Sequence, residues 1–222
     1  MKILDRTVAP LQVDDDGLSI LRAVAAGEQE PLIRFSRPEA TVAFGRRDEL
    51  NPGFDEASRA ARELGFSSWV RRVGGRAAAY HPGCVIVDHF MAEEDAISGN
   101  QQRYRRFGDL YARTLTELGV PSARGELPQE YCPGEFSVHA VLPDGSRTKI
   151  VGTAQRVIPG GWWFSAGLVI EHPEPLRQVL TRSYAALNLE MDPSTVGAAA
   201  QAEPQLRWED VVDALQEEFS AR

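Results

Sequence analysis

Residues 135–171, EFSVHAVLPDGSRTKIVGTAQRVIPGGWWFSAGLVIE, are the stretch that decides the fold. Two strong turn signals divide it, Pro-Asp-Gly at 143–145 and Pro-Gly-Gly at 159–161. Apolar segments separated by such turns are typical of antiparallel strands. We therefore predict a meander of three strands, in which residues 135–142 pair with residues 147–154 across the first turn.

The rest of the chain mixes helical and extended patterns. Apolar residues at helical spacing predict helices over residues 17–27, 54–66, 99–119 and 208–222. Short apolar runs predict strands over residues 31–37, 40–46, 67–73 and 84–90, with a turn at Pro38 between the first two. One face of the helix at 99–119 carries a stripe that predicts core packing, and Gly108 marks a candidate break in that helix. The stripe consists of Tyr104, Phe107, Tyr111 and Leu115. The predicted fold class is α/β (α+β), with one mixed, largely antiparallel sheet packed with helices.

Composition limits the function classes. The 222 residues are 43% hydrophobic, which is enough for one core, so we expect a single domain over residues 1–222. A net charge of −8 disfavours nucleic acid as a partner. The chain has no run of 18 apolar residues and no apolar signal segment at its start, so we expect no membrane association. Two cysteines far apart form no zinc or disulfide framework, which favours a reducing cytoplasm.

One of the two cysteines lies in the motif EYCPGEF at 130–136. Pro and Gly directly after Cys132 weaken a strand, which predicts a loop where the thiol can be exposed. A cationic neighbour would lower the pKa of such a thiol and make it reactive. The alternative is a buried, inert cysteine. That alternative suits Cys84, which begins the apolar run CVIVDHF, better than it suits Cys132.

Lys149 is the second candidate. Of 24 basic residues only Lys2 and Lys149 are lysine, so Lys149 marks a place where arginine does not suffice, unless chance placed it there. The meander would bring Lys149 beside Cys132. Its ammonium would then lower the pKa of the thiol and polarise a substrate carbonyl. Gly152, three residues on, suggests a close backbone approach to an extended ligand.

A second glycine-rich segment, RRVGGRAAAYHPG at 71–83, follows a predicted strand. The pair Gly74-Gly75 lets the backbone approach a ligand and offers free amides, and Arg71 and Arg72 add charge. A glycine turn without a ligand is the alternative. No G-K-[ST] follows, so this is not a Walker loop. The four histidines show no metal-ligand spacing, and we predict no metal site.

Taken together, these motifs resemble the lipoate–protein ligase/octanoyltransferase superfamily, whose catalytic fold is shared with biotin protein ligase. The resemblance covers most of the chain. It is carried by Arg71-Arg72-x-Gly74-Gly75, Gly83 and Lys149-x-x-Gly152-x-Ala154-Gln155-Arg156. Within the superfamily, YCPGEFSV…KIVGTAQR is most similar to the cysteine-dependent octanoyl-[glycine cleavage H protein]:protein N-octanoyltransferases, or lipoyl amidotransferases.

The resemblance implies a mechanism. The Cys132 thiolate would accept an octanoyl or lipoyl group from an acylated H protein and pass it to a lysine of a second lipoyl-domain protein, such as an E2 subunit. Lys149 would orient the acyl carbonyl. The implied substrate-binding residues are Arg72, Gly74, Gly75, Gly83, Gly152, Ala154 and Gln155. It implies no ATP or metal cofactor, and no C-terminal accessory domain.

Two departures from the wider family pattern bear on the alternatives. Val73 stands where many relatives have Ser, and Ala79 stands where the ATP-dependent ligases tend to have a His, with His81 two residues further on. Three alternatives remain: an octanoyl-acyl carrier protein transferase, an ATP- and Mg-dependent ligase that does not use Cys132, and a non-catalytic carrier-binding module. The sequence leaves open the donor, the acyl chain, the acceptor and the oligomeric state.

Overall fold

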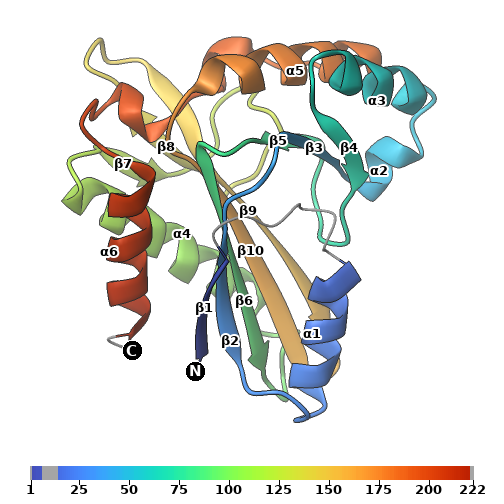
Figure 1. Cartoon of the computed structure of the whole chain (residues 1–222), viewed down its shortest axis with the longest axis vertical. Helices are drawn as coiled ribbons and strands as arrows, with labels where there is room; N and C mark the ends of the chain where they lie inside the picture. The colour runs from blue at the N-terminus through green and yellow to red at the C-terminus, as the bar shows by residue number, and fades with distance from the viewer. Residues whose placement is uncertain (1, 7–14, 221–222) are drawn as a thin grey trace.

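The computed structural model of the protein describes residues 2–6 and 15–220, and its centre is a seven-stranded sheet (Figure 1). The strand order is β1 (Lys2–Arg6), β2 (Leu32–Ser36), β6 (Cys84–Ala92), β10 (Gly161–Val169), β9 (Arg147–Ile158), β8 (Val138–Val141) and β7 (Ser122–Arg124). Only β1 and β2 run parallel in this sheet. A smaller sheet has the order β4 (Ser67–Val70), β3 (Thr41–Phe44) and β5 (Ala78–Tyr80). The predicted mixed, largely antiparallel architecture is confirmed.

The predicted meander is present as β8, β9 and β10. Tight turns join the three strands, and His139 lies opposite Lys149 across β8 and β9. The pairing shifts at a bulge between Val138 and His139, and β8 covers β9 only as far as Val151. A bulge re-aims side chains at the end of a strand pair. The part of β9 beyond Val151 is paired by β10 alone within the described sheet, and it forms one side of the cavity described below.

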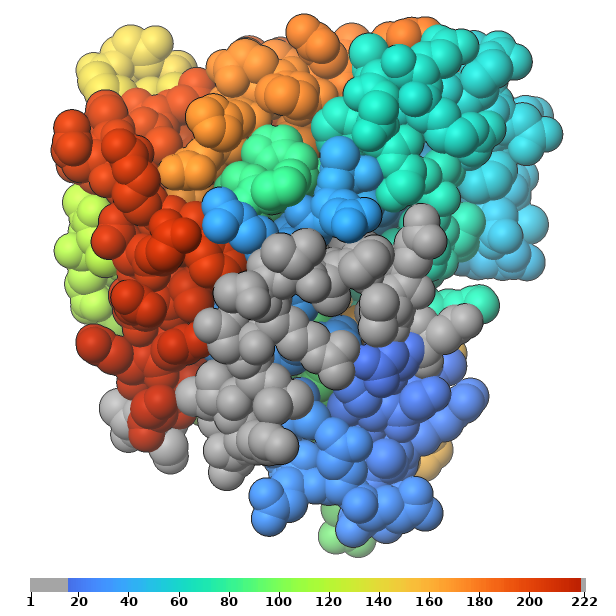
Figure 2. Space-filling model, viewed as in Figure 1, coloured from blue at the N-terminus to red at the C-terminus, as the bar shows by residue number. Residues whose placement is uncertain are grey.

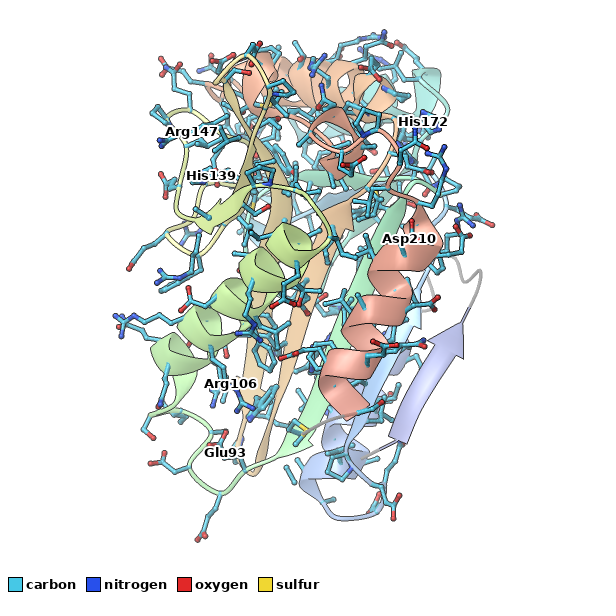
Figure 3. All side chains as sticks on the ribbon, turned by 90° about the vertical axis from the view of Figure 1, so that its left-hand side faces the viewer. Glu93, Arg106, His139, Arg147, His172 and Asp210 are labelled. Atoms are coloured by element: carbon cyan, nitrogen blue, oxygen red, sulfur yellow. The ribbon has the colours of Figure 1, made fainter. Side chains whose placement is uncertain are left out.

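Helices cover both faces of the large sheet. Figures 1 and 3 show α4 (Asn100–Glu117) and α6 (Trp208–Ser220) together on one face, and Figure 1 shows α1 (Asp15–Ala25) on the other. The stripe predicted for α4 is buried at Phe107, Tyr111 and Leu115, and it joins α6 in one core. On the opposite face, Leu21 of α1 packs with Trp163 of β10. Removal of these apolar side chains from water holds the layers together.

The smaller sheet has its own helical cover. Two helices, α3 (Phe54–Glu63) and α5 (Pro173–Ala186), lie against each other and form the upper surface in Figure 2. Three short elements, α2 (Arg46–Glu49), η2 (Pro193–Thr195) and η3 (Ala199–Gln201), complete the described fold. Tyr184 of α5 is buried in the core beneath this layer, together with Tyr131 from the Cys132 loop. The small sheet therefore closes over one end of the meander.

Two expectations need correction. Gly108 does not break α4, which is continuous. A Cβ at Gly108 would lie 2.6 Å from Cδ of Arg124, so the glycine makes room for β7 to pack on the helix. The strands predicted on either side of Pro38 exist as β2 and β3, but they belong to different sheets. The predicted end of the last helix, residues 221–222, lies outside the described residues. Within those residues, no helix is long and apolar enough to cross a membrane.

Candidate active site

A cavity of about 290 Å³ lies where the large and small sheets meet. Its walls come from the loop after β4, the loop at 130–137, strands β5, β9 and β10, and helix α4. The predicted site residues in its lining are Cys132, Lys149, Gly74, Gly75, Gly152 and Ala154. Residues as far apart in the chain as Arg71 and Gly167 therefore meet around one space, which is the usual form of a small-molecule site.

Cys132 is held in an unusual backbone conformation at the edge of this cavity. Its φ is +42°, in the left-handed region that non-glycine residues rarely adopt. Its backbone N–H donates to Tyr184 Oη (2.6 Å), and its carbonyl accepts from Lys149 Nζ (2.8 Å). Such strain persists only where neighbouring groups fix the conformation, and it is concentrated at functional sites.

The Cys132 sulfur accepts two hydrogen bonds from cationic or backbone donors. The N–H of Arg76 lies 3.2 Å from Sγ, and Nη2 of Arg71 lies 3.4 Å from it. Burial raises the pKa of the thiol, but the charges of Arg71 and Lys149 and these two hydrogen bonds outweigh burial, so the pKa of Cys132 is below its ordinary value. Cys84 differs, because burial raises the pKa of its thiol to about 12. The cysteine with reactive chemistry is therefore Cys132.

Lys149 lies beside Cys132, as the meander predicted, but it does not hydrogen-bond the sulfur. Its Nζ donates to Glu130 Oε1 (2.8 Å), to the carbonyl of Tyr131 (2.9 Å) and to the carbonyl of Cys132 (2.8 Å). An ammonium has three N–H donors, so all of them are engaged. Lys149 and Glu130 are both buried. Lys149 therefore clamps the loop and acts on the thiol through its charge.

Glu130, for which the sequence predicts no role, also belongs to the site. Its carboxylate also accepts from Ser137 Oγ (2.5 Å) and from the backbone N–H of Leu127 (3.0 Å). A buried carboxylate needs such partners because desolvation penalises its charge. The signal was present in the sequence as a Glu two residues before the loop cysteine, but nothing local showed that it faces Lys149.

Arg71 lines the cavity and Arg72 does not, so a binding role for Arg72 stays a prediction. Arg71 is buried in the lining, whereas Arg72 is exposed and its carbonyl accepts from Arg156 (3.1 Å). Both residues follow the end of β4, and the path of the chain there turns only Arg71 toward the cavity. Local sequence could not decide which of the two would do so.

Gly83 and Gln155 also lie outside the cavity lining. The N–H of Gly83 donates to His81 Nδ1 (2.8 Å), and its carbonyl accepts from the N–H of Ile170 (3.0 Å). Gln155 accepts from Arg103 Nε (3.1 Å) and donates to Asn100 on α4. Both residues therefore have contacts that stabilise the fold, and their binding role stays a prediction.

Small residues and aromatic rings shape the interior of the cavity. Gly152 of β9 pairs with Gly167 of β10, and a Cβ on Gly167 would run into the ring of Tyr80. On the other side, Tyr104 stacks on Phe136 with ring centroids 4.9 Å apart. Tyr104 was predicted to lie in the core, but it is half-buried and lines the cavity. Missing side chains on neighbouring strands leave a narrow slot with largely apolar walls.

None of the four histidines is part of the cavity lining. Figure 3 shows His139 and His172 well apart, on β8 and at the start of α5. His81 bonds the backbone of Gly83 and His172, and burial lowers the pKa of His89 to about 3. Among the described residues no histidine pairs with Cys132, and no group of His, Cys, Asp and Glu is arranged to hold a metal. Arg71 and the Arg76 N–H occupy the place that a histidine takes in a Cys–His dyad.

Gly75 allows the thiol to approach the loop after β4. Its φ is +107°, and a Cβ there would lie 2.8 Å from Cys132 Sγ. We expect Gly75→Ala to cost about 1–3 kcal/mol of stability and to slow alkylation of Cys132 by about tenfold, because the methyl group would crowd both Arg71 Nη2 and the sulfur and weaken the contacts that hold the thiolate. Chemical denaturation and iodoacetamide kinetics measure the two effects. Gly74→Ala is the matched control, because its φ is not positive and a Cβ there has nothing within 4 Å. Equal effects of the two variants would contradict this role for Gly75.

The fold and the site define a catalytic domain of the lipoate-ligase type. The chain superposes on lipoate-protein ligase A bound with ATP with a TM-score of 0.71, at 19% identity, over 99% of this chain and 84% of that one. It superposes on the putative lipoate protein ligase of T. acidophilum with bound lipoic acid with a TM-score of 0.68, at 17% identity, over 99% of this chain and 84% of that one. The protein belongs to the lipoyl protein ligase A/B catalytic domain family, whose model matches residues 18–220.

The chain is also similar in sequence to a protein whose name states a particular activity. Octanoyl-[GcvH]:protein N-octanoyltransferase of Geobacillus kaustophilus (strain HTA426) is 29% identical over 175 residues. The match covers 79% of this chain and 59% of the relative, so it spans about three fifths of the relative's length.

Proposed function

We propose that this protein is an acyltransferase that moves an octanoyl or lipoyl group through a thioester on Cys132 to a lysine of a lipoyl-domain protein, with acylated glycine cleavage H protein as the donor. The observation that supports this most directly is the Cys132 sulfur at the cavity. It is hydrogen-bonded by the Arg76 N–H and by Arg71, and the pKa of the thiol is lowered. The activity named for the Geobacillus relative supports the same reaction.

The first step is attack of the Cys132 thiolate on the carbonyl carbon of the acyl-lysine amide. A carbon–sulfur bond forms, the carbonyl oxygen becomes an oxyanion, and collapse breaks the carbon–nitrogen bond as the departing lysine amine takes up a proton. In the second step the neutral amine of the acceptor lysine attacks the thioester, loses a proton and expels the thiolate. The two proton transfers cancel over the cycle. Two steps with a good nucleophile replace one direct amide exchange.

Arg71 is the cation best placed to serve this chemistry. It is buried, it lines the cavity, and it contacts the attacking sulfur. A fixed positive charge beside the reacting carbonyl stabilises an oxyanion more strongly in a site removed from water. The slot beside Gly152, Ala154 and Gly167 would hold the acyl chain, because an unbranched chain fits between strands that lack side chains.

The hydrogen bonds of Lys149 favour the transferase over an ATP-dependent ligase. Activation by ATP places a phosphate in the site, and a phosphate needs cations with free donors. All three donors of Lys149 are engaged, one of them by the carboxylate of Glu130. Transfer between two lysine amides needs neither ATP nor a metal ion, since the bonds broken and formed are nearly equivalent.

Intact-mass measurement tests the proposal. The protein is incubated in turn with octanoylated H protein, with octanoyl-acyl carrier protein, and with octanoate plus ATP and Mg²⁺. We expect one octanoyl adduct on Cys132 with the H-protein donor, and we expect neutral hydroxylamine to remove it, as it removes thioesters. A lipoylated donor reports by its mass whether the lipoyl group is also accepted. Acylation of an acceptor domain only when ATP is present, without an adduct on Cys132, would overturn the proposal in favour of the ligase.

A further inference from the structure

Tyr184 ties together the two loops that meet at the Cys132 sulfur. Its Oη accepts from the backbone N–H of Cys132 (2.6 Å) and donates to the carbonyl of Ala77 (3.0 Å). Cys132 belongs to the loop at 130–137, and Ala77 follows the glycine loop that supplies the Arg76 N–H. One buried hydroxyl group on α5 therefore spans both walls of the site.

The Tyr184 hydroxyl also helps to hold Cys132 in its strained backbone conformation. The left-handed conformation of Cys132 is held at its carbonyl by Lys149 and at its N–H by Tyr184. Each bond uses a peptide group that has no strand partner, and a buried N–H without an acceptor is costly. Without the hydroxyl, the N–H of Cys132 and the carbonyl of Ala77 both lose their partner. Cys132 is then free to relax toward an ordinary conformation.

We infer that Tyr184 is a positioning residue for the Cys132 thiol: it fixes the distance from Sγ to the Arg76 N–H and to Arg71 by joining the two loops through its hydroxyl oxygen. The sulfur lies 3.2 Å from one donor and 3.4 Å from the other, and small displacements weaken such bonds. Tyr184 touches the backbone of the nucleophile and acts through it.

The charged and titratable groups that face the sulfur come from every surrounding element. Arg71 directly follows β4, Lys149 lies on β9, Tyr80 on β5, Tyr104 on α4, Tyr184 on α5, and Tyr131 in the same loop as Cys132. Among the described residues, Arg71 and Lys149 are the two whose charges lower the pKa of the thiol, and Lys149 is anchored independently by Glu130. Loss of the Tyr184 hydroxyl is therefore expected to act on the contacts of the sulfur with Arg71 and the Arg76 N–H.

The test compares Tyr184→Phe with Tyr111→Phe. Tyr111 is the matched control, because it is equally buried and its hydroxyl bonds His89 (3.2 Å) in the α4 core, away from the cavity lining. The readout is the rate of iodoacetamide alkylation of Cys132 as a function of pH, followed by peptide mass. For Tyr184→Phe we expect the titration midpoint of the thiol to rise and the rate at pH 7 to fall about tenfold, whereas Tyr111→Phe keeps both unchanged. Indistinguishable profiles for the two variants would overturn the inference.

A second measurement needs no variant. In the folded wild-type protein the amide of Cys132 should be protected from hydrogen exchange, because its N–H is bonded to a buried oxygen. An amide that exchanges as fast as an open loop would also overturn the inference. The inference deepens the proposed function, yet alkylation and exchange measure the thiol and its backbone directly. The alkylation and exchange results can therefore support the role of Tyr184 even if no acyl donor reacts. Conversely, acyl transfer can be observed even if those results contradict the role of Tyr184.

Discussion

Cys132→Ser is expected to lower acyl transfer from the H-protein donor by at least about a thousandfold. The contacts from Arg71 and the Arg76 N–H stabilise a thiolate, whose pKa already lies below its ordinary value. A serine hydroxyl in the same place is far from ionised near neutral pH. Single-turnover transfer from octanoylated donor to an apo lipoyl domain measures the loss, and chemical denaturation checks that the fold is unchanged.

The control for this variant is Cys84→Ala, which removes the other thiol. Cys84 is buried at the start of β6, outside the cavity lining, and its thiol stays protonated. Transfer should be retained. If Cys132→Ser instead left ATP-driven lipoylation intact, the ligase alternative would be correct. If the wild-type protein bound carrier domains without any transfer, the protein would be a binding module.

The same lowered pKa sets the pH dependence of the reaction. Thioester formation should rise with pH through the pKa of the folded thiol and level off above it, with a midpoint below that of an ordinary cysteine. Ionisation of the Cys132 thiol also contributes to the free energy of unfolding. Because the folded pKa is depressed, that contribution is present above the unfolded pKa and is lost as the pH falls through the folded value.

Lys149→Met is expected to have the largest effect on stability, about 3–5 kcal/mol, because it leaves the Glu130 carboxylate buried without its cation. Both side chains are almost fully buried and their charged atoms lie 2.8 Å apart. The variant also removes the donor that holds the Cys132 carbonyl, so acyl transfer should fall as well. Urea denaturation measures the first effect, and single-turnover transfer measures the second.

The double variant Glu130→Gln/Lys149→Met separates two effects of Lys149: its buried ion pair with Glu130, and its hydrogen bond to the Cys132 carbonyl. The double variant removes both buried charges, so most of the lost stability should return. Transfer should stay low, because the carbonyl of Cys132 still lacks its donor and the thiol still lacks one cation. Full recovery of transfer in the double variant would contradict the role of Lys149 as a clamp. A single Lys149→Met variant as stable as wild type would contradict the buried ion pair.

Arg71 and Arg72 differ in a way that the sequence alone does not predict, because only Arg71 lines the cavity. The sequence indicates that a cationic pair precedes the glycine loop, but the direction of each side chain depends on how β4 joins β3 and on where the loop turns. The position of Tyr104 is likewise only partly predicted by the sequence. Its helical spacing places it correctly on the inner face of α4, yet its contact with Phe136 arises because the Cys132 loop, not the sheet alone, covers that part of the helix.

The meander was determined by the sequence itself, because tight turns and strand pairing are set by residues close together in the chain. The hairpin of β8 and β9 then places Lys149 near a cysteine that lies 17 positions earlier, which is again a short-range consequence. Only the tertiary structure decided that Arg71 contacts the sulfur across 61 positions and that Tyr184 holds its backbone across 52. Such contacts depend on how two sheets and α5 close on one another, and no local pattern carries that information.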